Sequence, residues 1–176
     1  FYWRRAVILG MSISTFPLLH VVMSLIGISS GLIVLVGMFG SRRLDGWTAL
    51  FLGTTVFTSA SGFAFPRDQV LPSHIVGVVS LLVLAVAIAA LYVYRLKGAW
   101  RWIYVSSAVL ALYLNVFVGV VQAFLKVPSL NALAPTQSSP PFIVAQGVVL
   151  LLFMGLGVAA VRAFRPETEV PAWSMA

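Results

Sequence analysis

The chain of 176 residues contains no cysteine and little charge, with only four acidic residues and charged residues making up 9% of the sequence. The absence of cysteine excludes disulfide bonds, thiolate metal ligands and thiol catalysis. All acidic residues lie in connections or near the C-terminus, at Asp45, Asp68, Glu167 and Glu169. Ion-coupled transport usually needs a carboxylate within the membrane, so the sequence disfavours a proton or sodium pump. It also has no Gly-rich phosphate loop, paired carboxylates or Ser-His-Asp arrangement, which argues against an enzyme.

Apolar residues, in contrast, make up 61% of the chain. Five long runs that are almost free of charge cover residues 13–39, 46–66, 71–94, 102–124 and 142–163. Each run is close to the ~20 residues that an α-helix needs to cross the ~30 Å hydrocarbon core of a bilayer. Because a backbone in lipid must satisfy its own polar groups, we expect each run to be helical. The sequence therefore predicts an all-α membrane protein, a compact bundle of five transmembrane helices over residues 13–165.

Shorter segments flank and connect the five runs. We expect residues 1–12 to be an N-terminal extension or an interfacial segment, and residues 166–176 to be a cytoplasmic tail. The longest connection, residues 125–141, carries four prolines and is expected to be an outer loop that partly lies back on the bundle. No internal repeat is visible, so an inverted-repeat transporter is not indicated.

Basic residues gather in the connections on one side of the predicted bundle. They are Arg42, Arg43, Arg95, Lys97, Arg101, Arg162 and Arg165. The loops on the other side hold only Arg67 and Lys126, although Arg4 and Arg5 would add to that side. The positive-inside rule therefore predicts an external N-terminus and a cytoplasmic C-terminus. The net charge of +7 lies in these short clusters, a placement that indicates the lipid bilayer as partner and argues against nucleic acid.

Aromatic residues border the same basic clusters. They are Trp47, Trp100, Trp102 and Tyr104. Tryptophan and tyrosine are enriched where a membrane meets water. We therefore expect these four side chains to form an interfacial belt on the cytoplasmic side.

The polar residues within the runs fall mainly in the predicted outer half of the bundle. We predict a pocket there whose cofactor-binding residues are His20, His74, Asn115, Gln122 and Gln146. The inner stretches 32–39, 83–91 and 148–158 have no strongly polar side chain. Polar groups within a membrane are a functional hypothesis by default. The alternative is structural, because such side chains also hydrogen-bond between packed membrane helices, as do the Thr and Ser residues of the second run.

His20 and His74 are the two histidines of the chain, and both are predicted to lie near the outer surface. If their helices pack together, two neutral imidazoles could ligate the iron of a b-type haem. A quinone pocket that uses the same histidines with Asn115, Gln122 and Gln146 is a second possibility. Two histidines are few for a tight metal site of another kind.

Two small-residue motifs predict helix contacts. Gly27 and Gly31 form a GxxxG in the first run, and Gly155 and Ala159 form a related pair in the fifth run. Small residues at this spacing let two helix backbones approach closely. Whether each pair packs within the bundle or against another subunit is open at this point.

Three segments resemble stretches of small polytopic bacterial inner-membrane proteins of unknown function. They are Arg43–Leu52 (RLDGWTALFL), Leu71–Gly77 (LPSHIVG) and Ala134–Phe142 (APTQSSPPF). The resemblance covers most of the chain after Met11. It implies a multi-pass protein of the bacterial plasma membrane with a compact bundle, and it carries over no cofactor or catalytic residue.

These features together favour a non-catalytic integral membrane protein, an accessory or scaffold subunit of a larger bacterial membrane complex. The first alternative is an electron-transfer protein that binds haem b through His20 and His74, or a quinone, in the outer pocket. The second is a small-molecule transporter or channel, which would require a polar path through the cytoplasmic half. The accessory role is favoured because no acidic residue lies within the apolar runs and because small-residue helix faces are available for partner subunits.

Overall fold

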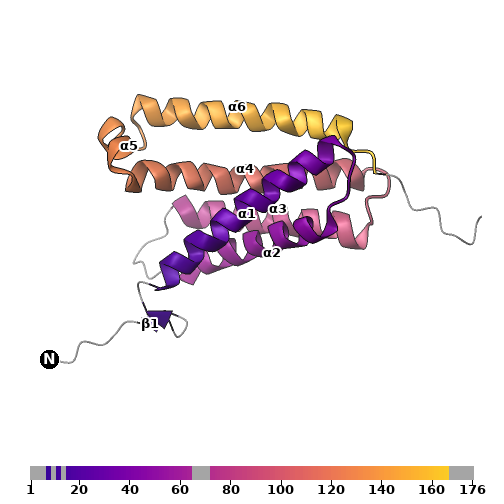
Figure 1. Cartoon of the computed structure of the whole chain (residues 1–176), viewed down its shortest axis with the longest axis horizontal. Coiled ribbons are helices and arrows are strands. Elements are labelled where there is room, and N and C mark those ends of the chain that lie inside the picture. Colours follow the sequence, from indigo (N-terminus) through magenta and orange to yellow (C-terminus); the bar gives the residue numbers. More distant parts are fainter. Residues whose placement is uncertain (1–6, 9–10, 13–14, 65–71, 167–176) are drawn as a thin grey trace, which may run out of the picture.

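The computed structural model describes residues 7–8, 11–12, 15–64 and 72–166, and in these ranges it is almost entirely helical. The long elements are α1 (Thr15–Phe39), α2 (Asp45–Ser61), α3 (Pro72–Ile88), α4 (Trp100–Lys126) and α6 (Pro140–Ala163). Three short segments accompany them: the 3₁₀-helix η1 (Gly62–Ala64), the π-helix η2 (Ala89–Val93) and the helix α5 (Pro128–Leu133). The long helices run up and down side by side, with α6 at one edge of the bundle and α5 at one end (Figure 1).

A two-residue pairing precedes the first helix. Strand β1 (Val7–Ile8) lies antiparallel to β2 (Met11–Ser12), with Val7 opposite Ser12 and Ile8 opposite Met11. The rest of the predicted N-terminal extension and residues 167–176 of the predicted tail lie outside the described residues. Arg67 lies outside them as well.

Four of the described helices are long and apolar enough to cross a bilayer. They are Thr15–Phe39, His74–Val93, Trp100–Lys126 and Pro140–Ala163. The protein is therefore an all-α membrane protein in class. The predicted run 46–66 differs from the other four, because α2 has 17 residues and a less apolar sequence, whereas α3, also of 17 residues, continues through η2 to Val93. Its inner face carries buried Thr48, Thr54, Thr55 and Thr58.

The core of the bundle forms between α1, α2, α3 with η2, and α4. Gly31 lies so close to the neighbouring helices that a Cβ atom there would be 2.6 Å from Leu112 and 2.9 Å from Phe51. Gly27, one turn away, faces Thr54 and Thr55 at slightly longer range. The predicted Gly27–Gly31 motif therefore packs within the chain. On α6 the outcome is the opposite, because Gly155 and Ala159 are exposed and no described atom lies within 4 Å of a Cβ at Gly155.

The predicted outer loop 125–141 is more regular than expected. Helix α4 continues to Lys126, and α5 follows almost at once over Pro128–Leu133. Helix α5 lies back on the end of α4, where Asn131 Nδ2 donates a hydrogen bond to the Phe124 carbonyl at 3.2 Å. These helical turns were not predicted, because the four prolines of the segment indicated a loop. Proline is, however, tolerated in the first turn of a helix.

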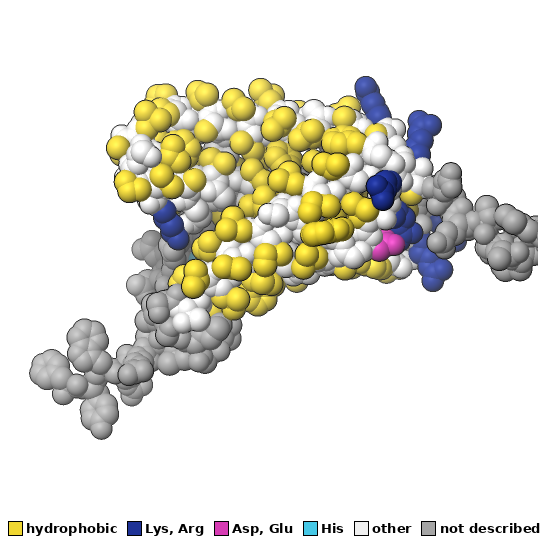
Figure 2. Space-filling view, in the orientation of Figure 1, with side chains coloured by type: hydrophobic (Ala, Val, Ile, Leu, Met, Phe, Trp, Pro, Cys, Tyr) yellow, Lys and Arg dark blue, Asp and Glu magenta, His cyan; other side chains and the backbone are white. Residues whose placement is uncertain are grey.

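One end of the bundle, which we call the basic end, holds the connections 40–44 and 94–99 and the C-terminal end of α6. Figure 2 shows lysine and arginine side chains gathered there, while the face between the two ends is mainly hydrophobic. Trp47 and Trp102 at this end are exposed by 46% and 49% of their surface. Trp100 stacks on Tyr94 with ring centroids 3.6 Å apart. Tyr104 is 3% exposed, so its predicted place in the interfacial belt is wrong and it belongs to the core.

Candidate functional site

The polar groups at the centre of the bundle form one direct contact between helices. Asn115 of α4 donates a hydrogen bond from Nδ2 to Thr55 Oγ1 of α2 at 2.9 Å. Gly27 of α1 lies over this pair, and a Cβ atom there would be 3.3 Å from Thr55 Oγ1 and 3.4 Å from Asn115 Nδ2. Because Thr55 is fully buried, this bond is shielded from competing water; it joins α4 to α2, and α1 packs over it.

Three other buried hydroxyls of α1 and α2 bond within their own helices. Thr54 Oγ1 donates to the Leu50 carbonyl at 2.7 Å, and Ser30 Oγ donates to the Ile26 carbonyl at 2.6 Å. Thr58 Oγ1 likewise donates to the Thr54 carbonyl. These bonds to the preceding turn satisfy each hydroxyl without a second helix. The geometry supports the structural interpretation of the Thr and Ser residues.

His20 lies toward the end of the bundle opposite the basic end, which we call the far end. Its Nδ1 is 2.9 Å from Ser61 Oγ, and Ser61 Oγ donates its proton to the Thr58 carbonyl at 3.2 Å. Ser61 thus links His20 of α1 to the last turn of α2.

His74 lies at the same far end, in the first turn of α3. Its ring packs against Phe63 of η1 with centroids 5.5 Å apart. Gly77 makes room for the Phe63 ring, because a Cβ at Gly77 would be 3.1 Å from that ring. Ser61 and Phe63 are two residues apart, so the two histidines pack against the same end of the α2–η1 segment.

The two predicted glutamines have different surroundings. Gln146 of α6 donates from Nε2 to the Phe117 carbonyl of α4 at 3.1 Å, while its Oε1 is buried and has no hydrogen-bond partner among the described residues. Gln122 lies on the exposed surface of α4. Thus Asn115, His20 and Gln146 each bond to a different partner, and Gln122 faces outward.

Within the described residues there is no group of three or more His, Cys, Asp or Glu side chains that could hold a metal ion. That finding does not bear on a haem, which needs only two axial ligands. The haem and quinone assignments of His20, His74, Asn115, Gln122 and Gln146 stay predictions.

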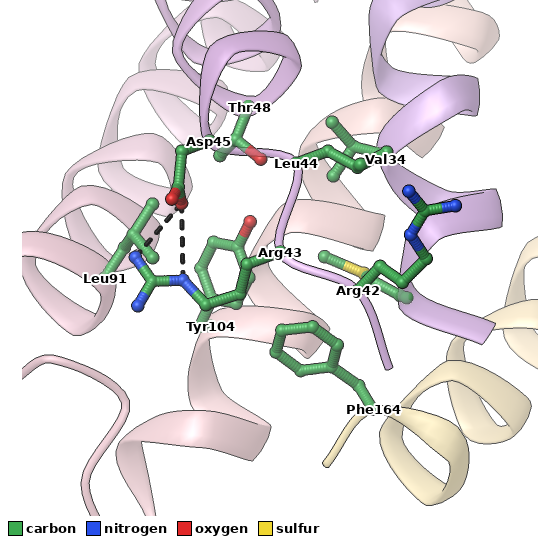
Figure 3. Close-up of a pocket in the computed structure, with 10 residues that line it drawn as sticks. Val34, Arg42, Arg43, Leu44, Asp45, Thr48, Leu91, Tyr104 and Phe164 are labelled. Atoms are coloured by element: carbon green, nitrogen blue, oxygen red, sulfur yellow. Dashed lines mark hydrogen bonds and ion pairs between the residues drawn. The ribbon is translucent and has the colours of Figure 1, made fainter. Parts of the chain in front are cut away.

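The basic end holds a small cavity of about 10 Å³ that the sequence did not suggest. Figure 3 shows its lining, with Arg43 paired to Asp45 across 3.0 Å and Tyr104 and Phe164 beneath them. Both members of the ion pair are well exposed, and exposed ion pairs of this kind contribute little to stability. A space of this size fits a water molecule and no larger ligand.

Two side chains beside this cavity fasten the end of α6 to the bundle. Ser41 Oγ donates to the Ala163 carbonyl at 2.6 Å and accepts from the Arg165 backbone N–H at 3.0 Å. Arg101 donates from Nη1 to the Val161 carbonyl at 3.2 Å and to the Phe164 carbonyl. These bonds satisfy carbonyls at the C-terminal end of α6 that the helix itself leaves unpaired.

A second hollow lies between α4 and α6 and has a volume of about 400 Å³. Val109 of α4 and Phe153 of α6 are among the apolar residues that line it, and Arg162 lies at its basic end. No pattern in the sequence predicts this groove, because a groove depends on how far apart two helices lie. No protein-family model, curated protein or solved structure matches this chain.

Proposed function

We propose that this chain is a non-catalytic integral protein of the bacterial inner membrane that crosses the bilayer five times. The fifth crossing is α2 with η1, residues 45–64. At 1.5 Å per residue in the α-helix and about 2 Å in the 3₁₀-helix, this segment is roughly 31 Å long. That length matches the ~30 Å hydrocarbon core, and packing against α1 and α3 shields the threonines of α2 from lipid.

We further propose that the basic end faces the cytoplasm and the far end faces outward. The support is the charge distribution, because seven of the eight described basic residues belong to the basic end and Lys126 ends α4 at the other. The exposed Trp47 and Trp102 at the basic end would then lie at the cytoplasmic membrane interface.

Single cysteines test this topology cleanly, because the chain contains none of its own. Arg42→Cys, Lys97→Cys and Gln137→Cys each place a thiol on an exposed connection. A membrane-impermeant maleimide applied to intact spheroplasts should label only Gln137→Cys, and the other two should react after permeabilisation. Labelling of Arg42→Cys and Lys97→Cys from opposite sides would show that α2 does not cross, and the fully inverse pattern would overturn the orientation.

Within the membrane, we assign the chain the role of an accessory or scaffold subunit of a larger complex. The observation that carries this assignment is the outward face of α6, where Gly155 and Ala159 offer a neighbouring helix a close approach. The buried hydroxyls support it as well, since their hydrogen bonds are used within the bundle and serve packing.

A photoreactive residue at Ala159 should cross-link the protein in its native membrane to a transmembrane partner. The same residue at Leu82, which is equally outward on α3 with 63% exposure, provides the matched control and should give little adduct. Equal adducts at both positions would contradict the proposal. So would a strictly monomeric particle that purifies in mild detergent without a second protein.

The alternative function is electron transfer through haem b, or quinone binding, at the far end. Its support is the placement of His20 and His74 against the same α2–η1 segment. Protein expressed with ample haem should then show a Soret band that is lost in His20→Ala and in His74→Ala. An absent band, or a band that both variants retain, would remove the haem version.

A further inference from the structure

The groove between α4 and α6 is apolar along most of its length and basic at one end. Its apolar walls include Val109 and Tyr113 of α4 and Phe153 and Gly157 of α6. Along α6 the lining runs from Leu150 to Arg162, a rise of about 18 Å at 1.5 Å per residue. One leaflet contributes about half of the ~30 Å hydrocarbon core, so the groove is as long as a leaflet is deep.

Arg162 marks the end of this groove that lies at the membrane surface. Its side chain is exposed and forms no hydrogen bond or ion pair with any other residue that the structure describes. Arg43 at the same end, in contrast, is paired with Asp45. An unpaired guanidinium beside an apolar groove offers a phosphate group planar, bidentate hydrogen bonding.

The size of the groove distinguishes between possible occupants. A transmembrane helix about 10 Å across needs roughly 1,400 Å³ over an 18 Å length. The empty space of the groove is about 850 Å³ even with its open side included, which is less than a helix occupies and enough for a single hydrocarbon chain. Basic pockets between transmembrane helices on the cytoplasmic side are known to hold anionic lipid headgroups.

We propose that this groove binds one anionic glycerophospholipid, with an acyl chain between α4 and α6 and its phosphate on Arg162. The assignment requires only that these helices lie in a bilayer, so it is independent of the accessory role. The orientation proposed above would place the lipid in the cytoplasmic leaflet.

The full-length protein is exchanged into detergent that contains phosphatidylglycerol or phosphatidylcholine with identical acyl chains, and retained lipid is counted by native mass spectrometry. We expect one tightly retained phosphatidylglycerol per protein and weaker retention of phosphatidylcholine. Arg162→Gln should lower phosphatidylglycerol retention about fivefold, as expected for one basic residue at an anionic surface. Arg165→Gln is the matched control, because Arg165 lies at the same end and does not line the groove. Equal loss in both variants, or equal retention of the two lipids, would overturn the phosphate assignment.

The acyl-chain part of the proposal is tested by filling the groove. Gly157→Leu should displace either lipid, whereas Gly155→Leu, two residues away on the outward face, should leave retention unchanged. Ser106→Leu fills the groove from α4 and serves as a second variant if Gly157→Leu does not fold. Full retention in a folded filled variant would overturn the site. Cross-linking at Ala159 measures partner binding separately, so failure of the accessory role and failure of the lipid site give different results.

Discussion

The α1–α2 and α4–α6 pairs are both antiparallel helix pairs of this bundle, and they are packed in different ways. At the first, glycines of α1 admit the side chains of α2 and α4, and His20 of α1 is hydrogen-bonded to Ser61 of α2. At the second, the helices leave an apolar hollow. In the most apolar 18-residue stretch of α6 only 11% is buried, whereas in the corresponding stretch of α1 39% is buried. Because lipid is as apolar as leucine, helix association in a membrane depends on close packing and hydrogen bonds. The first pair has both, so we expect it to carry most of the stability.

The largest effect should come from overpacking the first pair at Gly31. Gly31→Val would place its Cβ 2.6 Å from Leu112 Cδ1 and 2.9 Å from the Phe51 ring, and both of these side chains are fully buried. We expect a loss of about 3 kcal/mol or more in the free energy of unfolding, at the upper end for overpacked cores. Unfolding in a detergent mixture followed by circular dichroism measures it. Gly155→Val is the control, and similar losses in both variants would show that the two pairs do not differ.

Removal of the central hydrogen bond should have an intermediate effect. Asn115→Leu deletes the donor to Thr55 Oγ1, and interhelical bonds of this kind contribute about 0.5–2 kcal/mol in membranes. Gln122→Leu on the same helix changes an exposed carboxamide and should cost much less. The same unfolding assay compares them, and an equal or larger loss in Gln122→Leu would contradict the assignment of the bond.

A smaller effect is expected where α6 is fastened at the basic end. Ser41→Ala removes one bond to the Ala163 carbonyl and one from the Arg165 N–H, at a cost of about 1 kcal/mol. The loss should be local, since α6 has few other contacts with α1. Amide exchange should therefore quicken in the last turn of α6 and stay unchanged in α2. Uniform quickening along the chain would show that α6 is not separable from the rest.

The smallest effect should follow from Gly157→Leu. The nearest atom to a Cβ at Gly157 is Val109 Cγ1 at 3.5 Å, an ordinary contact beside an open groove. We expect a change in unfolding free energy within about 0.5 kcal/mol, typical of a surface substitution. A thermal melt in detergent checks this, and a loss as large as that of Gly31→Val would mean that the hollow is closed in the folded protein.

The helical class of the protein followed from the sequence, because a long apolar run in lipid has no other way to satisfy its backbone. The sequence could not show which polar side chains meet. Asn115 and Gln122 are seven residues apart and share one helix face, yet only Asn115 has a partner on α2. Toward α5, α4 and α1 diverge (Figure 1), and Gln122 on that part of α4 is exposed.

The two small-residue motifs show likewise that spacing in the sequence does not determine which helix is contacted. Gly27–Gly31 and Gly155–Ala159 have equal spacing, and one is buried between helices while the other faces outward. Spacing along one helix places two small residues on one side of it. It does not say which helix, if any, lies on that side, because that depends on the connections and on the packing of every other helix.

The inward-facing threonines of α2 have a consequence for the biogenesis of the protein. A segment of 17 residues with this many hydroxyls is a weak candidate for partitioning into the bilayer alone. Synthesis delivers α1 first, and the turn at residues 40–44 is short enough for α2 to fold back on it at once. We therefore expect the translocon to release the two as a hairpin, with α1 acting as an intramolecular chaperone for its neighbour.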